Sequence, residues 1–349
     1  MIVRLLAILS LACAAPTMAQ NGPAPLDLPA GKPFLHANSG ITLPVTLLDL
    51  PRVGASEYAT PQLDVLFSYK DTPLREELSV YIYRAPAGSP AVWFDQATEV
   101  IGMRPAFQRL TDIDLPATFT PPGQATASGM KAAWTVSDSQ IRSTALAIVP
   151  VGEWLVKFRY SSTVHEAASL LRRLDEVIAA MGWPAAIPSA PAATLVSDCA
   201  APLDLAGASK PVKEKGAGVA ADAFALILEA KLKAVDKGDR PVEWCRDRAA
   251  KSALPIYRPL GSANSYLAAL SDSGHGVWVR PSFAGLSAPG RKPRWSVSIV
   301  LAGEARNYPP RDRLPPPGQL DEILKDAPMS RVTTWGENQT ISIDTSRVK

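Results

Sequence analysis

Ser273 and His275 are the two residues whose types and spacing come nearest to nucleophilic catalysis. A serine hydroxyl becomes a nucleophile when an imidazole accepts its proton and a third group orients the imidazole. The pair lies in the polar segment 271–276, where no third group is evident and residues two apart seldom align a hydroxyl with a ring nitrogen. The segment is therefore predicted to be a turn before the strand that contains Trp278. A hydrolase with His275 as base and Ser273 as nucleophile is kept as the alternative.

Metal and cofactor sites need several convergent groups, and the sequence supplies few of them. The three histidines, His36, His165 and His275, stand far apart, whereas a metal site needs three or four ligands. There is no His-Glu-x-x-His motif, no Gly-x-Ser-x-Gly elbow and no complete phosphate-binding loop. Gly216 and Gly218 precede a helical pattern, but a third glycine and a preceding strand are missing. The sequence predicts neither a metal site nor a cofactor.

Tryptophan offers a different kind of chemistry, because its flat ring can stack on a sugar or peptide ligand. The chain has 8 tryptophans. Trp154 and Trp295 stand in clean strand alternation, which favours the core. Trp93, Trp244, Trp278 and Trp335 are not clearly on apolar faces, and Trp278 and Trp335 are the candidate binding residues among them. A place in the core or at a domain interface is the alternative for each of them.

Cysteine usage predicts one disulfide. Of the 3 cysteines, Cys13 lies in the N-terminal leader, which leaves Cys199 and Cys245 in the mature chain. An even pair in an oxidising compartment favours a disulfide, and closing so long a loop would stabilise the fold by about 4 kcal/mol. Two free thiols or a metal pair are the alternatives. Lipid attachment at Cys13 is a further alternative, although Ser10 stands where such sites usually have an aliphatic residue.

Residues 1–19 have the layout of a secretory signal peptide. One positive charge, Arg4, precedes an apolar run at residues 5–15, and small residues follow up to Ala19. The run is too short to cross a bilayer, which needs about 20 apolar residues. Cleavage is expected after Ala19, with Ala15 as the alternative site. The protein is therefore expected to be periplasmic or secreted, with no transmembrane segment.

Composition indicates an ordinary globular protein with no electrostatic preference for nucleic acid. Hydrophobic residues make up 47% of the 349 residues, and charged residues 20%. The net charge is +3, and it becomes +2 when Arg4 leaves with the leader. So weak a charge gives no reason to expect nucleic acid or anionic lipid as a partner. The 33 prolines predict many turns and linkers.

The first half mixes strands with one strong helix. Alternating or β-branched patterns predict strands at 63–70, 78–84, 131–136, 144–149 and 153–160. A short helix is predicted at 95–107. A longer helix is predicted over 164–181, where Thr163 and Glu166 fit a capping box and His165 is expected to face solvent.

The second half has the same mixture. A helix is predicted at 219–237, and a short one at 319–326. Strands are predicted at 266–271, 276–280, 294–302, 331–335 and 340–344.

The Pro- and Ala-rich stretch 185–193 reads as a linker between these halves. Residues 20–33 form a flexible lead-in, residues 34–184 a first domain and residues 194–349 a second domain that contains the disulfide. The predicted class is α+β, with two domains, each an antiparallel sheet packed with one or more helices.

The order of elements in residues 34–184 resembles the PsbP-like group of exported α/β proteins. The resemblance rests on the strands at 63–70 and 78–84, the hairpin around Pro150, and the strand that runs into the capped helix ending at Gly182. It implies an antiparallel sheet with helices on both sides and a noncatalytic accessory or binding role. No functional residue is carried over, and the second half resembles no known family.

These observations together favour a noncatalytic exported binding or accessory protein of the bacterial cell envelope. Its partner is expected to be another envelope component, bound in the cleft between the two domains, where ligand sites commonly lie. The periplasmic hydrolase that uses His275 and Ser273 is the alternative function.

Overall fold

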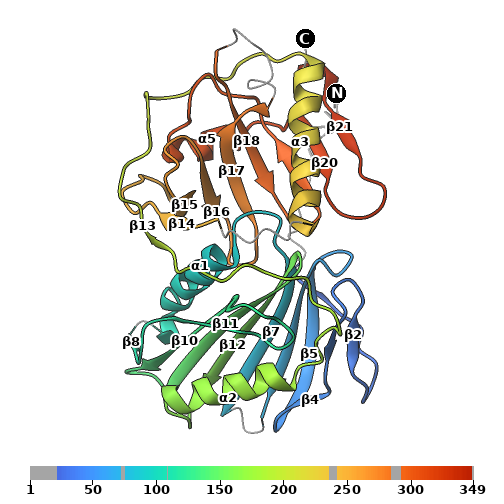
Figure 1. Ribbon diagram of the computed structural model, residues 1–349, viewed down its shortest axis with the longest axis vertical. Coiled ribbons are helices and arrows are strands. Elements are labelled where there is room, and N and C mark those ends of the chain that lie inside the picture. Colours follow the sequence, from blue (N-terminus) through green and yellow to red (C-terminus); the bar gives the residue numbers. More distant parts are fainter. Residues whose placement is uncertain (1–21, 72–74, 108, 236–241, 284–291, 348–349) are drawn as a thin grey trace, which may run out of the picture.

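The computed structural model describes residues 22–71, 75–107, 109–235, 242–283 and 292–347. For residues 229–235 it describes the backbone but not the side chains. The predicted signal peptide at residues 1–19 lies outside the described residues. Two antiparallel sheets dominate the fold, one in each half of the chain (Figure 1). The predicted mixture of antiparallel sheets and helices is confirmed.

The first sheet has ten strands in the order β1-β5-β6-β7-β12-β11-β10-β8, with β4 beside β5 and β9 beside β10. A separate pair, β2 and β3, lies next to it. The strands are β1 Ala24–Pro25, β2 Phe34–His36, β3 Ile41–Leu43, β4 Thr46–Leu47, β5 Leu50–Ala59, β6 Asp64–Lys70, β7 Glu76–Arg84, β8 Leu110–Asp112, β9 Ala117–Phe119, β10 Gly129–Val136, β11 Ser143–Val151 and β12 Trp154–Ser162.

Helix α2 (Ala167–Ala180) covers one face of this sheet (Figure 1). Its Leu170, Leu174 and Val177 are fully buried against the sheet. The predicted capping box is wrong, because the helix begins after Glu166 without a side-chain cap. The Ser162 hydroxyl instead accepts hydrogen bonds from the backbone N–H groups of Val164 and His165, at 3.1 and 3.0 Å. A sharp turn thus satisfies donors that the sequence pattern assigned to the helix.

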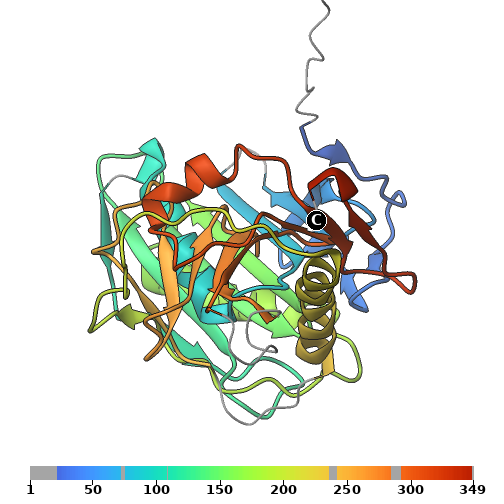
Figure 2. The same ribbon diagram turned by 90° about the horizontal axis from the view of Figure 1, so that it is seen from above.

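The second sheet has nine strands paired in sequence order from β13 to β21; β13 runs parallel to β14, and every later pair is antiparallel. Helix α3 (Gly216–Val235) packs on β20 and β21, and Figure 2 shows it nearly end-on beside the strands. A short helical segment, η2 (Pro317–Gln319) and α5 (Leu320–Ile323), covers another part of the sheet. The strands are β13 Ser197–Asp198, β14 Trp244–Arg246, β15 Ile256–Pro259, β16 Tyr266–Ala269, β17 Gly276–Pro281, β18 Trp295–Val300, β19 Glu304–Asn307, β20 Ser330–Thr333 and β21 Ile341–Ile343.

Helix α1 (Pro90–Gly102) lies at the junction of the two halves (Figure 1). The helix predicted at 95–107 starts earlier than expected. The Ser89 side chain accepts a hydrogen bond from the N–H of Val92, and Pro90 occupies the first turn, where its missing N–H costs nothing. Residues 105–107 form a separate 3-10 turn, η1. One continuous hydrophobic cluster contains α1, side chains of the first sheet such as Trp134, and side chains of the second sheet such as Tyr257.

The predicted disulfide between Cys199 and Cys245 is present, with the two Cα atoms 4.9 Å apart. It joins the residue after β13 to the centre of β14, next to Trp244. Within the described part of the chain, no helix combines the length and the apolarity that a membrane span requires.

Candidate functional site

A cavity of about 640 Å³ lies at the junction of the two halves. This volume is in the range of small-molecule sites. The first half contributes the residues before and at the start of α1 and the turn between β11 and β12. The second half contributes the side of α3, the ends of several strands and, among its larger side chains, Trp244, Trp278, Leu226, Phe283 and Val300.

Two tryptophans form an aromatic wall of this cavity. The rings of Trp244 and Trp278 have their centroids 5.6 Å apart and their planes tilted by 45°. Trp278 was predicted as a binding residue from sequence, and it lines the cavity. Trp244, which is likewise not clearly on an apolar face in the sequence, reaches the junction through the pairing of β14 with β15.

Trp335, the other predicted binding residue, is not among the residues that line the cavity, although the adjacent Thr334 is. Its ring packs edge-on against Trp154 with the centroids 5.4 Å apart, and the guanidinium of Arg84 lies 5.2 Å from its centroid. Arg84 also donates hydrogen bonds to the carbonyl of Ala302, at 2.6 Å, and to the Thr334 hydroxyl, at 3.1 Å. Trp335 therefore belongs to the contact between the halves.

The predicted linker forms a further wall of the cavity. Residues 188–194 line it, and they are held on the first half by two hydrogen bonds. The Thr126 hydroxyl donates to the carbonyl of Ala190 at 2.5 Å, and the N–H of Ala193 donates to the carbonyl of Ala127 at 2.9 Å. These hydrogen bonds hold the linker in place across the junction.

A buried ionic cluster also joins the halves. On β12, Lys157 is 3% exposed, and its Nζ lies 2.7 Å from Oδ2 of Asp272 in the turn between β16 and β17. The same ammonium donates to the carbonyl of Asp272 at 3.0 Å and lies 4.5 Å from the ring centroid of Tyr81. The turn sits close against β7: at Gly274, whose φ is +85°, a Cβ would come within 2.9 Å of Ala85 Cα.

Asp64, at the start of β6, is the second carboxylate of this cluster. The Ser273 hydroxyl is its hydrogen-bonding partner, but Oδ1 of Asp64 has none among the described residues. The hydroxyl of Tyr83, the residue paired with Asp64 across the two strands, is likewise buried without a partner there. The cluster therefore contains two buried polar atoms, Oδ1 of Asp64 and the Tyr83 hydroxyl oxygen, that make no hydrogen bond with the described residues.

Burial shifts the titration of these groups. Desolvation raises the pKa of Asp64 to about 6, although Lys157 and Ser273 act to lower it. Desolvation also lowers the pKa of Lys157, and Asp272 opposes that effect. For Asp272, burial acts to raise the pKa, but Lys157 outweighs it, so the pKa lies below its usual value. Shifted carboxylates and amines occur at functional sites and in structural ion pairs alike.

Ser273 and His275 are not aligned for acyl transfer. The Ser273 hydroxyl lies 3.0 Å from the Ser271 hydroxyl and interacts with Asp64. Nε2 of His275 is buried without a hydrogen-bonding partner in the described part of the chain, and burial lowers the pKa of its imidazole. The segment 271–276 is a turn that holds the junction, as its polar composition predicted.

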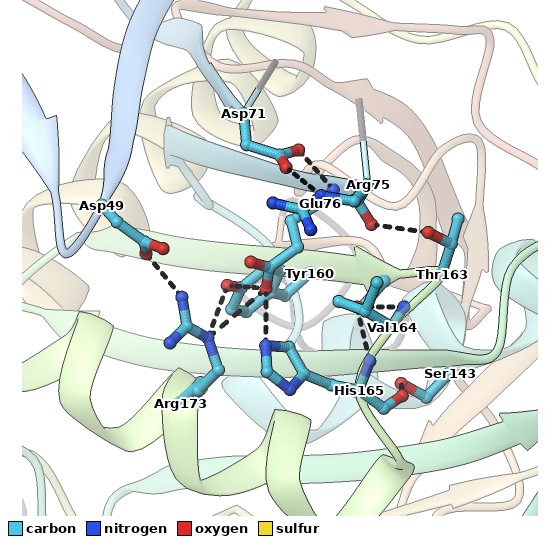
Figure 3. A network of polar contacts seen from close by, with 11 residues as sticks. Asp49, Asp71, Arg75, Glu76, Ser143, Tyr160, Thr163, Val164, His165 and Arg173 are labelled. Atoms are coloured by element: carbon cyan, nitrogen blue, oxygen red, sulfur yellow. Dashed lines mark hydrogen bonds and ion pairs between the residues drawn. The ribbon is translucent and has the colours of Figure 1, made fainter. Parts of the chain in front are cut away.

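A separate polar network lies on the α2 face of the first sheet (Figure 3). The Tyr160 hydroxyl donates to Oε1 of Glu76 at 2.6 Å, and Arg173 donates to the Tyr160 hydroxyl at 3.1 Å and to Asp49 at 2.6 Å. His165, expected to face solvent, is partly buried, with Nε2 3.3 Å from the same Glu76 oxygen. These groups satisfy one another, so the network fastens α2 and the β4–β5 turn to the sheet.

Among the described residues, no group of three or more His, Cys, Asp or Glu side chains is arranged to hold a metal ion. No protein-family model matches the chain, and the search of curated proteins found no match. One solved structure, the di-domain ARO/CYC StfQ from the steffimycin biosynthetic pathway, shares 9% identity over 85% of this chain and 76% of that chain. Its TM-score of 0.14 is too low to support any argument about fold or function.

Proposed function

We propose that this chain is a noncatalytic binding protein that holds a small, mainly apolar molecule in the cavity between its two sheets. The observation that carries the proposal is the cavity itself: about 640 Å³, walled by both halves and by the linker. Apart from Arg280, its larger lining side chains are aromatic or aliphatic, and proline and alanine supply much of the remainder.

The physical basis is desolvation of the ligand. Moving apolar surface out of water contributes about 25 cal/mol per Å², so a ligand of two or three fused rings would gain several kcal/mol before the costs of association. The rings of Trp244 and Trp278 add favourable contacts with a flat ligand. The lining also includes three exposed apolar side chains, Leu228, Val242 and Phe283.

The proposed setting is the periplasm or the exterior of a bacterial cell, with residues 1–19 as the export signal. The disulfide supports this setting, because such bonds persist in oxidising compartments. In this proposal residues 34–184 and 194–349 are the two domains that wall the site, and the ligand or its carrier is an envelope component.

Phenylnaphthylamine, an uncharged dye that fluoresces in apolar surroundings, tests the proposal. We expect saturable binding to the purified protein with one site per chain. Trp278→Ala should weaken the affinity by about tenfold, since it removes a large contact surface. Trp335→Ala is the matched control and should leave the affinity within about twofold. Absence of saturable binding, or equal losses in the two variants, would contradict the proposal.

A further inference from the structure

Arg159 on β12 is a partly buried arginine, and no ion pair among the described residues includes its guanidinium. Its partner across the strands is Ser79 on β7, and its guanidinium lies 5.0 Å from the ring centroid of Phe107 in η1. Burial lowers the pKa of Arg159 to about 10, and the charge of Arg104 adds to this shift. A cation that is partly removed from water without a counter-ion destabilises the folded state, and a bound anion would offset that cost.

Arg104 follows α1 and lies close to Arg159. The N–H of Phe107 donates to the carbonyl of Arg104 at 2.8 Å, so one 3-10 turn connects Arg104 to the ring that the Arg159 guanidinium contacts. The Arg104 side chain is exposed, and the ion pairs of the described residues do not include it. The two guanidinium groups repel each other, and an anion bound by both would relieve that repulsion.

The two carboxylates that attract the Arg159 guanidinium are already paired with lysines. Oδ2 of Asp272 lies 2.7 Å from Nζ of Lys157, and Oε1 of Glu77 lies 3.1 Å from Nζ of Lys70. Each of these pairs is neutral as a unit. The positive charge of the two arginines is therefore offset only in part by the protein itself.

Two tyrosines add hydroxyl groups to this region. Tyr81 lies opposite Lys157, two residues along β7 from Ser79, so it shares the face of the sheet from which Arg159 projects. Tyr58 on β5 is 50% exposed. Burial raises the pKa of both phenols and Arg104 opposes that shift, so the Arg104 guanidinium is near both rings. A phenol O–H can donate a hydrogen bond to an oxyanion.

We propose that Arg104 and Arg159 bind an oxyanion, a phosphate or sulfate group, on the face of the first sheet between α1 and the β16–β17 turn. Each planar guanidinium can bind two oxygen atoms of such a group with two N–H donors. The hydroxyls of Tyr58 and Tyr81 are further donors. None of these four residues lines the cavity, so the site is independent of the proposed apolar ligand.

Inorganic phosphate, titrated into the full mature chain with chloride as the only other small anion, tests the proposal. We expect one site per chain with a dissociation constant of about 1 mM or tighter by isothermal titration calorimetry. Sulfate should compete for the site, and affinity should fall as sodium chloride is raised, because ions screen the charges. Phenyl phosphate distinguishes the sources of the group: tighter binding than that of phosphate favours a phosphate ester, and equal binding favours the free anion.

Two arginine variants assign the binding to the proposed residues. Arg104→Gln and Arg159→Gln should each weaken phosphate binding by about tenfold, since hydrogen bonds between charged groups are the strong ones. Arg331→Gln is the matched control, because it removes an equally charged, half-exposed side chain on β20 and should leave the affinity within about twofold. Near-ultraviolet circular dichroism checks that each variant keeps its tertiary packing.

Absence of saturable phosphate binding to the wild-type protein overturns the proposal, and this measurement needs no variant. Unchanged affinity in Arg104→Gln, whose exposed side chain can be replaced without disturbing the core, also overturns it. Equal losses in Arg104→Gln and Arg331→Gln would show attraction to net charge alone and would likewise overturn it. Dye binding in the cavity is measured separately, so failure here leaves the proposed function standing.

Discussion

The cavity and the ionic cluster lie at the same junction but are built from opposite side chains. The cavity is walled by rings, prolines and alanines that leave space. The cluster is filled: Lys157, Asp272 and the turn at Gly274 leave no room even for a Cβ. A filled ionic contact fixes the relative position of two sheets, whereas an apolar void offers surface to a ligand. The comparison separates the residues that hold the two halves together from the residues that we propose to bind the ligand.

The largest expected effect is at Lys157. Lys157→Met should lower the free energy of unfolding by about 3 kcal/mol at neutral pH, because the Asp272 carboxylate, which is only 28% exposed, loses its buried counter-ion. Chemical denaturation followed by circular dichroism measures the change. Lys131→Met is the matched control: its partner Asp175 is 45% exposed, so the loss should be about 1 kcal/mol or less. Equal losses would show that the cluster is no stronger than a surface pair.

The disulfide should have the next largest effect, on the side of the junction that contains Trp244. Replacing Cys199 and Cys245 by serine opens a loop with a sequence separation of 46, which should cost about 2–4 kcal/mol. Denaturation with and without reductant measures the same quantity on the wild-type chain. Stability unaffected by both treatments would contradict the expected role.

Asp64 should make stability depend on pH. Its folded pKa is raised to about 6 from a usual value near 3.8, so the folded state binds a proton more tightly than the unfolded state. The contribution is fully present below pH 3.8 and is lost as pH rises toward 6, up to about 3 kcal/mol in total. Asp64→Asn should remove this part of the pH dependence, measured as the free energy of unfolding between pH 4 and 7. A wild-type profile retained by the variant would refute the assignment.

The smallest expected effect is at Trp335. Trp335→Leu should lower the free energy of unfolding by about 1 kcal/mol, because it removes the ring contacts with Trp154 and Arg84. Dye affinity should stay within about twofold of wild type. A strong loss of binding would show that the contact region and the binding region are not separate.

Several features of the protein follow from the sequence alone. Alternating or β-branched apolar patterns identified β6, β7, β11, β12 and β17; one face of β6, β7 and β17 is more buried than the other, whereas β11 is buried on both faces. The helical periodicity of the apolar residues in α2 and α3 predicted these two helices just as clearly. The pairing of Cys199 with Cys245 followed from the count of cysteines outside the predicted signal peptide. All of these signals are local or depend on composition.

Only the tertiary structure determined which residues meet at the junction of the two halves. Lys157 stands in a strand pattern where its face could equally have met solvent, and only the approach of the turn that contains Asp272 buries it. The short strands β14, β15 and β19 were not predicted, because three or four residues show too little alternation. Trp244, Trp278 and Arg280 meet at one cavity because the second sheet pairs its strands in sequence order and then packs against the first. Such contacts join residues far apart in the chain, so no local pattern records them.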